Sequence, residues 1–91
     1  MNIETAITGY IQSLQMMDYP AELVNRRHFT FQRFLNAYDD FDSSSLRNFI
    51  EDNSFLSREY FILLKLDIFC LLRYLEQQGL IGTEVFRELE L

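Results

Sequence analysis

The stretch that most constrains the fold is the apolar run at residues 57–79, SREYFILLKLDIFCLLRYLEQQG. It begins with a serine that can cap a helix and ends with a glycine that can stop one. Between residues 60 and 75 the only charged side chains are Lys65, Asp67 and Arg73. A helix that is apolar on nearly all sides must pass through the middle of a core. It is also too short and too charged to span a membrane, which takes about 20 apolar residues.

Composition predicts a single domain that fills residues 1–91. Hydrophobic residues make up 48% of the chain and include 9 Phe and 5 Tyr, which excludes a disordered polypeptide. Cys70 is the only cysteine, so no disulfide can form within the chain, and this suits a reducing compartment. The first ten residues lack the basic and apolar regions of a secretory signal. We therefore expect a soluble, cytoplasmic domain that does not enter a membrane.

The net charge of −6 is unevenly distributed. Acidic and basic residues balance in residues 1–38 and again in residues 53–79. The acidic excess lies in residues 39–52, where five acids face one Arg, and in the C-terminal tail. The total charge argues against nucleic-acid binding. Because the acidic residues are concentrated in two segments, however, the surface formed by the other segments can be less acidic.

The spacing of apolar residues predicts four helices, near 3–17, 20–38, 43–53 and 57–79, with one or two further helical turns in the tail at 83–91. Asp42 or Ser43 can cap the third helix. Gly9 inside the first helix indicates that another group approaches it closely. We expect ten residues to be buried: Ile7, Leu14, Phe31, Phe34, Leu35, Phe49, Leu64, Ile68, Leu71 and Leu75.

The residue inventory does not favour catalysis. His28 is the only histidine, it lies on a different predicted helix from Cys70, and the chain shows neither metal-ligand spacing nor a Gly-rich phosphate loop. The acidic pair Glu51-Asp52 is best interpreted as a solvated helix end. We expect no catalytic residue, no metal and no cofactor in this chain.

A series of short motifs follows the chain in the order and with the loop lengths of a known domain. These motifs are Asp18-Tyr19-Pro20, Val24, Arg27, Phe31, Phe34-Leu35, the segment SLRNFI at 45–50, Leu56-Ser57, LLRYL at 71–75, Gly79-Leu80-Ile81 and the tail VFRELEL. In this register the chain resembles the N-terminal core-binding (SAM-like) domain of tyrosine recombinases, the phage-integrase and Xer type. The resemblance implies an all-α fold, a four-helix SAM-like orthogonal bundle with a short C-terminal tail.

The resemblance also implies a function in DNA integration and recombination. The chain would be a non-enzymatic arm that clamps duplex DNA opposite a catalytic domain, which would follow in the parent recombinase and supply its tyrosine nucleophile. Its partners would be DNA, that catalytic domain and neighbouring recombinase subunits. By position, the expected DNA-contacting residues are Asn25, Arg26, Thr30 and Arg33 on the second helix, and Ser57, Arg58, Tyr60, Ile62 and Lys65 on the fourth.

Two departures from the family weaken the expected DNA affinity of the isolated domain. The segment at 60–65 carries one base where the family usually has two or three, and Arg27 replaces a common Tyr. Phosphate neutralisation supplies much of such binding. The alternative is a helical protein–protein interaction module of a phage or bacterial protein that does not bind DNA. Phe29, Ile62 and Phe69 favour it, because they point away from the assumed core; the competing explanation is that some of them pack under the tail or against a missing domain.

Asp67 is a charged residue on the face of the central helix that should meet the second helix. A buried carboxylate without a partner would be strongly unfavourable. Arg27 and His28 lie on the inward stripe of the second helix. We therefore expect Asp67 to pair with Arg27 or His28 across this interface.

Overall fold

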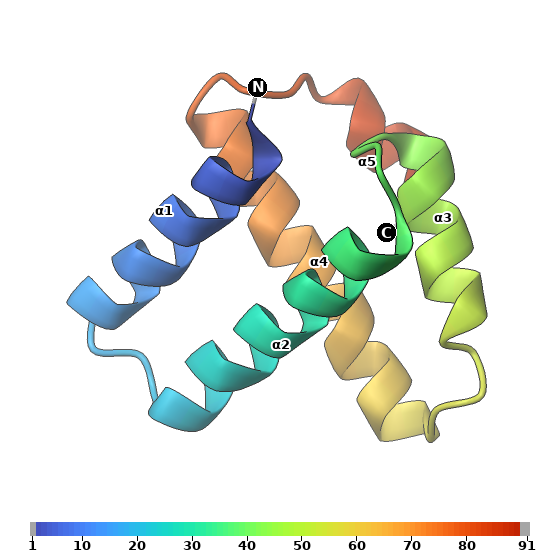
Figure 1. The fold of residues 1–91 in the computed structure, drawn as a ribbon, viewed down its shortest axis with the longest axis horizontal. Helices are drawn as coiled ribbons and strands as arrows, with labels where there is room; N and C mark the ends of the chain where they lie inside the picture. The colour runs from blue at the N-terminus through green and yellow to red at the C-terminus, as the bar shows by residue number, and fades with distance from the viewer. Residues whose placement is uncertain (1, 90–91) are drawn as a thin grey trace.

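The computed structural model describes residues 2–89, and all of its regular secondary structure is helical (Figure 1). The described part of the chain holds five helices: α1 (Ile3–Met16), α2 (Ala21–Ala37), α3 (Ser43–Asp52), α4 (Arg58–Gln77) and α5 (Glu84–Leu89). The four predicted helices are confirmed to within two residues at each end. The predicted turns in the tail correspond to α5, and residues 90 and 91 of that prediction lie outside the described range.

Side chains cap three of the helices at their first turn, where backbone N–H groups have no partner within the helix. Asn2 caps α1, and Ser57 caps α4 as predicted. For α3 the cap is Asp42, whose carboxylate accepts a hydrogen bond from the amide of Ser45 at 2.8 Å. This bond lowers the pKa of Asp42. The start of α2 has no side-chain cap, and Pro20 directly precedes it.

The C-terminal ends of α1 and α4 have the same geometry. The backbone enters the left-handed region at Asp18, with φ 58°, and at Gly79, with φ 72°. In each case the amide of the next residue donates to the carbonyl five residues before it, at 3.2 Å and 2.9 Å respectively. This is the Schellman pattern of helix termination, and the predicted stop at Gly79 is confirmed.

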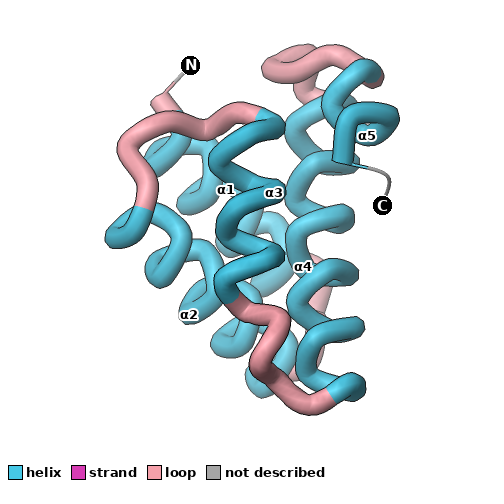
Figure 2. Tube along the Cα trace, turned by 90° about the vertical axis from the view of Figure 1, so that its right-hand side faces the viewer, coloured by secondary structure: helices cyan, strands magenta, loops and turns pink. Residues whose placement is uncertain are grey.

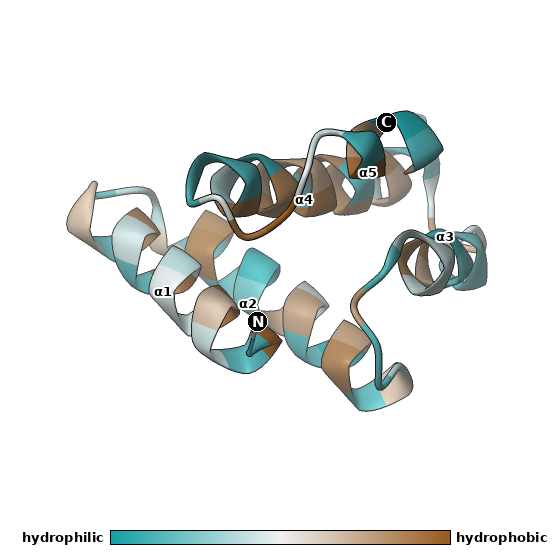
Figure 3. Ribbon diagram, turned by 90° about the horizontal axis from the view of Figure 1, so that it is seen from above, coloured by the Kyte–Doolittle hydropathy of each residue, from teal (hydrophilic) through white to brown (hydrophobic). Residues whose placement is uncertain are grey.

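The helix α4 lies between two groups of elements. Figure 1 shows α1 on one side of it and α3 on the other, with α2 crossing it. Figure 2, turned by 90°, shows α3 running beside α4 with α5 against one end of α4. From above, α4 and α5 form a layer over α1 and α2 (Figure 3). The described residues form a compact all-α globule of 32 × 29 × 22 Å.

The buried side chains form two clusters that share α2 and α4. The α1-side core joins α1 to these two helices and consists of Ile7, Tyr10, Ile11, Leu14, Val24, Phe31, Leu71 and Leu75. The α3-side core joins α3 to them and consists of Phe34, Leu46, Phe49, Leu64, Ile68 and Leu72. Because α4 contributes to both clusters, its predicted place in the middle of the core is confirmed.

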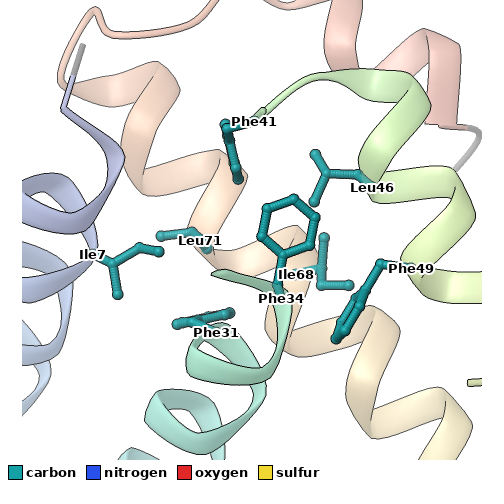
Figure 4. Close-up of a pocket in the computed structure, with 8 residues that line it drawn as sticks. All are labelled: Ile7, Phe31, Phe34, Phe41, Leu46, Phe49, Ile68 and Leu71. Atoms are coloured by element: carbon teal, nitrogen blue, oxygen red, sulfur yellow. The ribbon is translucent and has the colours of Figure 1, made fainter. Parts of the chain in front are cut away.

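A small cavity lies where the two cores meet (Figure 4). Its volume is about 10 Å³, close to that of a single water sphere. Eight apolar residues line it, among them Phe34, whose ring packs edge-on against Phe41 and Phe49 at 5.8 and 5.4 Å between centroids. This cavity is a packing gap and does not have the polar groups of a ligand site.

Most of the predicted core is confirmed. Nine of the ten residues expected inside are buried, whereas Leu35 is only half-buried. Gly9 has the predicted close neighbour, because a Cβ there would lie 3.3 Å from the Tyr74 hydroxyl. One outer stripe of α4, with Ile62 and Leu66, is exposed, so this helix is not covered on all sides. Within residues 2–89 no helix is long and apolar enough to cross a membrane.

Candidate binding groove between α2 and α4

A groove of about 230 Å³ lies between α2 and α4, which we call the α2–α4 groove. Two aromatic residues that line it remain largely exposed: Phe29 is 66% exposed and Tyr60 is 64% exposed. The groove is lined by Arg26, Phe29, Thr30, Arg33, Leu56, Tyr60, Leu63, Leu64 and Asp67.

The two helices contribute to the groove with the same spacing. The lining positions are 26, 29, 30 and 33 on α2, and 60, 63, 64 and 67 on α4. Residues at i, i+3, i+4 and i+7 share one face of a helix. Each helix therefore presents a complete two-turn stripe to the groove, and the charged residues occur at the ends of these stripes.

Asp67 is the buried acid of this interface and has no exposed surface. Its Oδ1 accepts hydrogen bonds from Nη2 of Arg26 at 2.7 Å and from Nε of Arg27 at 3.0 Å. Its Oδ2 accepts from Nε of Arg26 at 2.9 Å. The predicted pairing with Arg27 is confirmed. The alternative partner was wrong, because His28 is exposed and lies 3.4 Å from the Gln32 amide.

Arg26 is the partner that sequence reasoning missed. It was assigned to the outward, DNA-facing side of α2, because it lies one position off the inward stripe. Its long side chain nevertheless lies in the interface and forms a bidentate pair with Asp67, which raises the pKa of Arg26 through hydrogen bonding. Thr30, four residues further along the same side, is also buried, so this side of α2 faces α4 and not open solvent.

Arg27 connects the Asp67 carboxylate to α1. Its Nη1 donates to the Tyr10 hydroxyl at 2.8 Å, and its Nη2 lies 3.6 Å from the Cys70 sulfur. Burial raises the pKa of Tyr10 to about 12, although the Arg27 charge acts in the opposite direction. Among the described residues every buried side-chain nitrogen and oxygen has a hydrogen-bond partner. The cluster is thus fully satisfied, and its two guanidinium groups and one carboxylate leave a net charge of +1.

A second polar cluster, around Asn53, lies at the other end of the groove. Arg33 donates to Oδ1 of Asn53, and its guanidinium lies 6.0 Å from the Phe29 ring centroid and 5.7 Å from that of Phe49. Asn53 is buried, and its Nδ2 donates to the Phe49 carbonyl at 2.7 Å. The sequence identified Asn53 only as the end of a helix. An Asn in that position gives no signal that its side chain turns inward.

The remaining predicted DNA-contacting residues add no exposed side chain to the groove, and three of them, Arg58, Ile62 and Lys65, share another face of α4. Thr30, expected to contact DNA, is buried at the base of the groove. Asn25 is exposed on α2, and Ser57 is the cap of α4. On α4, a rotation of 100° per residue places Arg58 and Ile62 about 160° from Tyr60 and Lys65 about 140° from it.

Lys65 has an aromatic neighbour of its own outside the groove. Its ammonium group lies 4.9 Å from the Phe61 ring centroid. Of the nine candidates, the structure therefore brings together Arg26, Arg33 and Tyr60 around the groove, with Thr30 buried beneath them. Phe69, expected to be exposed or under the tail, packs edge-on against Phe86 of α5 at 5.5 Å. Its packing under the tail is confirmed.

The acidic and sulfur-containing side chains do not form a metal site in the part of the chain that the structure describes. No three His, Cys, Asp or Glu residues within 2–89 are grouped to hold an ion. The groove offers a ligand aromatic rings, aliphatic side chains and guanidinium groups.

Comparison with known proteins returned no match: no family model fits the sequence, and neither a curated protein nor a solved structure is similar to the chain. The assignment to the recombinase core-binding domain, with its SAM-like topology, therefore stays a prediction. The structure establishes a compact all-helical domain of about 90 residues.

Proposed function

We propose that this chain is a non-catalytic helical interaction module that binds an amphipathic helix of a partner protein in the α2–α4 groove. The observation that carries the proposal is the pair of matched stripes, in which Phe29 and Tyr60 are about two-thirds exposed beside a floor of Leu56, Leu63 and Leu64. Aromatic and arginine side chains are enriched at the centres of protein interfaces. A groove between two helices is a common receptor for an amphipathic helix.

Exposed apolar surface continues from the groove around α4. Leu66 follows Leu63 by three residues, and Ile62 precedes Leu66 by four, so neighbouring side chains form a continuous band. Both Ile62 and Leu66 are exposed, at 50% and 45%. An extended apolar surface of this kind is typical of interaction sites in soluble proteins. It supports a protein partner better than it supports the phosphate backbone of DNA.

The test is selection of binders from a displayed library of random 16-residue peptides against the whole 91-residue chain. We expect peptides with apolar residues at helical spacing to be enriched. Phe29→Ala and Tyr60→Ala should each weaken the selected peptides at least tenfold, as expected for interface anchors. The matched control is Met16→Ala, because Met16 is highly exposed at the far end of α1 and outside the groove. Failure to enrich any groove-dependent peptide would contradict the proposal.

Duplex DNA binding is the second candidate function, as the arm of a tyrosine recombinase with a SAM-like fold. It is favoured by one observation: among residues 2–89 the ion pairs all involve Asp67, so Arg33, Arg58 and Lys65 carry charges without a carboxylate partner. Against it, Arg26 is already paired with Asp67, and only Arg58 and Lys65 share one face of α4, because Arg33 lines the groove. So few basic side chains can neutralise only a few DNA phosphates, which supports only weak binding.

Fluorescence anisotropy with a 20-base-pair duplex tests the DNA candidate. Binding should be weak at 50 mM salt, nearly absent at 200 mM salt, and lost when Arg58 and Lys65 are both replaced by Glu. Equal binding at both salt concentrations would exclude the phosphate model. Detectable, salt-sensitive binding together with an empty peptide selection would make DNA the preferred partner.

A further inference from the structure

The α2–α4 groove carries positive charge although the chain as a whole is acidic. Its lining includes two guanidinium groups, those of Arg26 and Arg33, and one carboxylate, that of Asp67. Arg27 lies directly behind, so the cluster around Asp67 keeps a net charge of +1. The acidic excess lies in residues 39–52 and in the tail, and none of residues 39–52 and 83–89 lines the groove. The groove is thus complementary in charge to an acidic ligand.

The two arginines of the Asp67 cluster differ in access. The Arg27 side chain is 7% exposed and hydrogen-bonded to Asp67 and Tyr10, whereas the Arg26 side chain is 32% exposed along the groove. A guanidinium group has five N–H donors. Asp67 accepts two of the five from Arg26. The other three donors of Arg26 remain for a ligand, while Asp67 holds the guanidinium in place.

Arg33 repeats this arrangement farther along α2. One of its donors binds Asn53, and its guanidinium is held near the Phe29 and Phe49 rings. Arg26 and Arg33 are seven residues apart, which is about two helical turns or roughly 10 Å along the axis. Phe29 lies between them on the same face. Two oriented cations therefore flank one exposed aromatic ring.

We propose that the partner helix is acidic, with two carboxylates about two turns apart that bind Arg26 and Arg33 and apolar residues between them that pack on Phe29 and Tyr60. This inference rests on the proposed function and specifies its ligand. Pre-oriented guanidinium groups favour planar carboxylates through charge-assisted hydrogen bonds. The acidic surface elsewhere on the molecule repels such a helix, which restricts it to the groove.

The test uses the peptides selected from the random library. An Asp or Glu at two positions six to eight residues apart should be enriched together with the apolar residues. For a selected peptide, Arg26→Gln or Arg33→Gln should weaken binding at least tenfold. Exchange of the matching peptide Glu for Gln should remove most of that difference in a double-mutant cycle. The matched control is Arg58→Gln, which removes an exposed charge outside the groove and should leave binding unchanged.

One further variant and one competitor make the result decisive. If Arg26→Gln does not fold, Arg26→Lys keeps a cation beside Asp67 but loses the bidentate fork, and it should still weaken the acidic peptides several-fold. Groove-dependent peptides without a fixed acidic position would overturn this inference and leave the proposed function intact. No groove-dependent peptides at all would overturn both. A 20-base-pair duplex that displaces the peptides in an Arg26-dependent manner would assign the two cations to phosphate instead.

Discussion

Both sides of the α2–α4 pair bury a polar side chain, but the two side chains are stabilised by different chemistry. Facing α1, the interface buries a carboxylate, Asp67, which is held by two guanidinium groups. Facing α3, it buries a neutral amide, Asn53, which binds one guanidinium and one backbone carbonyl. A charge in the core must be matched by charge as well as by hydrogen bonds, whereas an amide needs only its hydrogen bonds. The first arrangement is therefore the more fragile.

The apolar cores on the two sides differ in a related way. The α1-side core contains Tyr10, whose ring packs against Tyr74 at 5.1 Å while its hydroxyl binds Arg27. The α3-side core is entirely hydrophobic and is organised by edge-to-face packing around Phe34. Directional hydrogen bonds align the helices on one side, and interlocking aromatic rings align them on the other.

Removing the buried charge should give the largest effect. We expect Asp67→Ala to lower the free energy of unfolding by about 3–5 kcal/mol, because it leaves the buried Arg27 without a counter-charge. Adding Arg27→Met should recover part of the loss, since the pair is then replaced by apolar volume. Urea unfolding followed by circular dichroism measures both. A double variant no more stable than Asp67→Ala would show that this ion pair is not the source of the effect.

On the α3 side, Phe34→Ala should cost a comparable amount, about 3–5 kcal/mol, by opening a large cavity. The new void would adjoin the existing gap of about 10 Å³ in the middle of the core. The contrast with Asp67 is that no second truncation restores stability: Phe34→Ala with Phe49→Ala should be less stable than either single variant. Urea unfolding is again the measurement, and recovery in the double variant would contradict the packing argument.

Sequence patterns predicted the features that depend on position along a helix. The four long helices, the cap at Ser57 and the stop at Gly79 follow from periodicity and local hydrogen bonding. The cap at Asp42 and the pairing of Asp67 with Arg27 were each one of two predicted alternatives. The patterns failed where the packing of α2 on α4 encloses a polar side of α2 and where a side chain turns inward from a helix end. Arg26 is an example of the first, and Asn53 of the second. The groove requires the crossing of α2 and α4, which no local pattern specifies.

Asn53→Ala should have an intermediate effect, a loss of about 1–2 kcal/mol. It removes the acceptor of Arg33 and the donor to the Phe49 carbonyl. Arg33 is partly exposed and can turn to water, so the loss is smaller than for a buried charge. The measurement is thermal unfolding, compared directly with Asp67→Ala. A larger loss for Asn53→Ala than for Asp67→Ala would reverse our ranking of the two sides.

Alkaline pH should weaken the α1 side through Tyr10. The pKa of Tyr10 is raised from 10.0 to about 12 in the folded state. The neutral hydroxyl therefore contributes stability fully below pH 10, and this contribution is lost as the pH rises toward 12. The loss amounts to about 1 kcal/mol near pH 11. Urea unfolding at pH 9 and pH 11 should show a smaller decrease for Tyr10→Phe than for the unmodified chain; an equal decrease would assign the effect to other groups.

The smallest predicted effects concern the matched helix ends at Asp18 and Gly79, which share left-handed geometry but not residue type. Gly79→Ala should destabilise by about 1 kcal/mol, because the left-handed conformation costs a side chain roughly 1–2 kcal/mol and the gain in unfolded-state entropy offsets only part of this. A Cβ at Gly79 would meet no atom within 4 Å, so the loss is purely conformational. Asp18→Gly should stabilise by about 0.5 kcal/mol for the opposite reason. Thermal unfolding of both variants measures the two changes in stability. Changes of the same sign would mean that side-chain contacts, and not backbone conformation, determine the stability of the two helix ends.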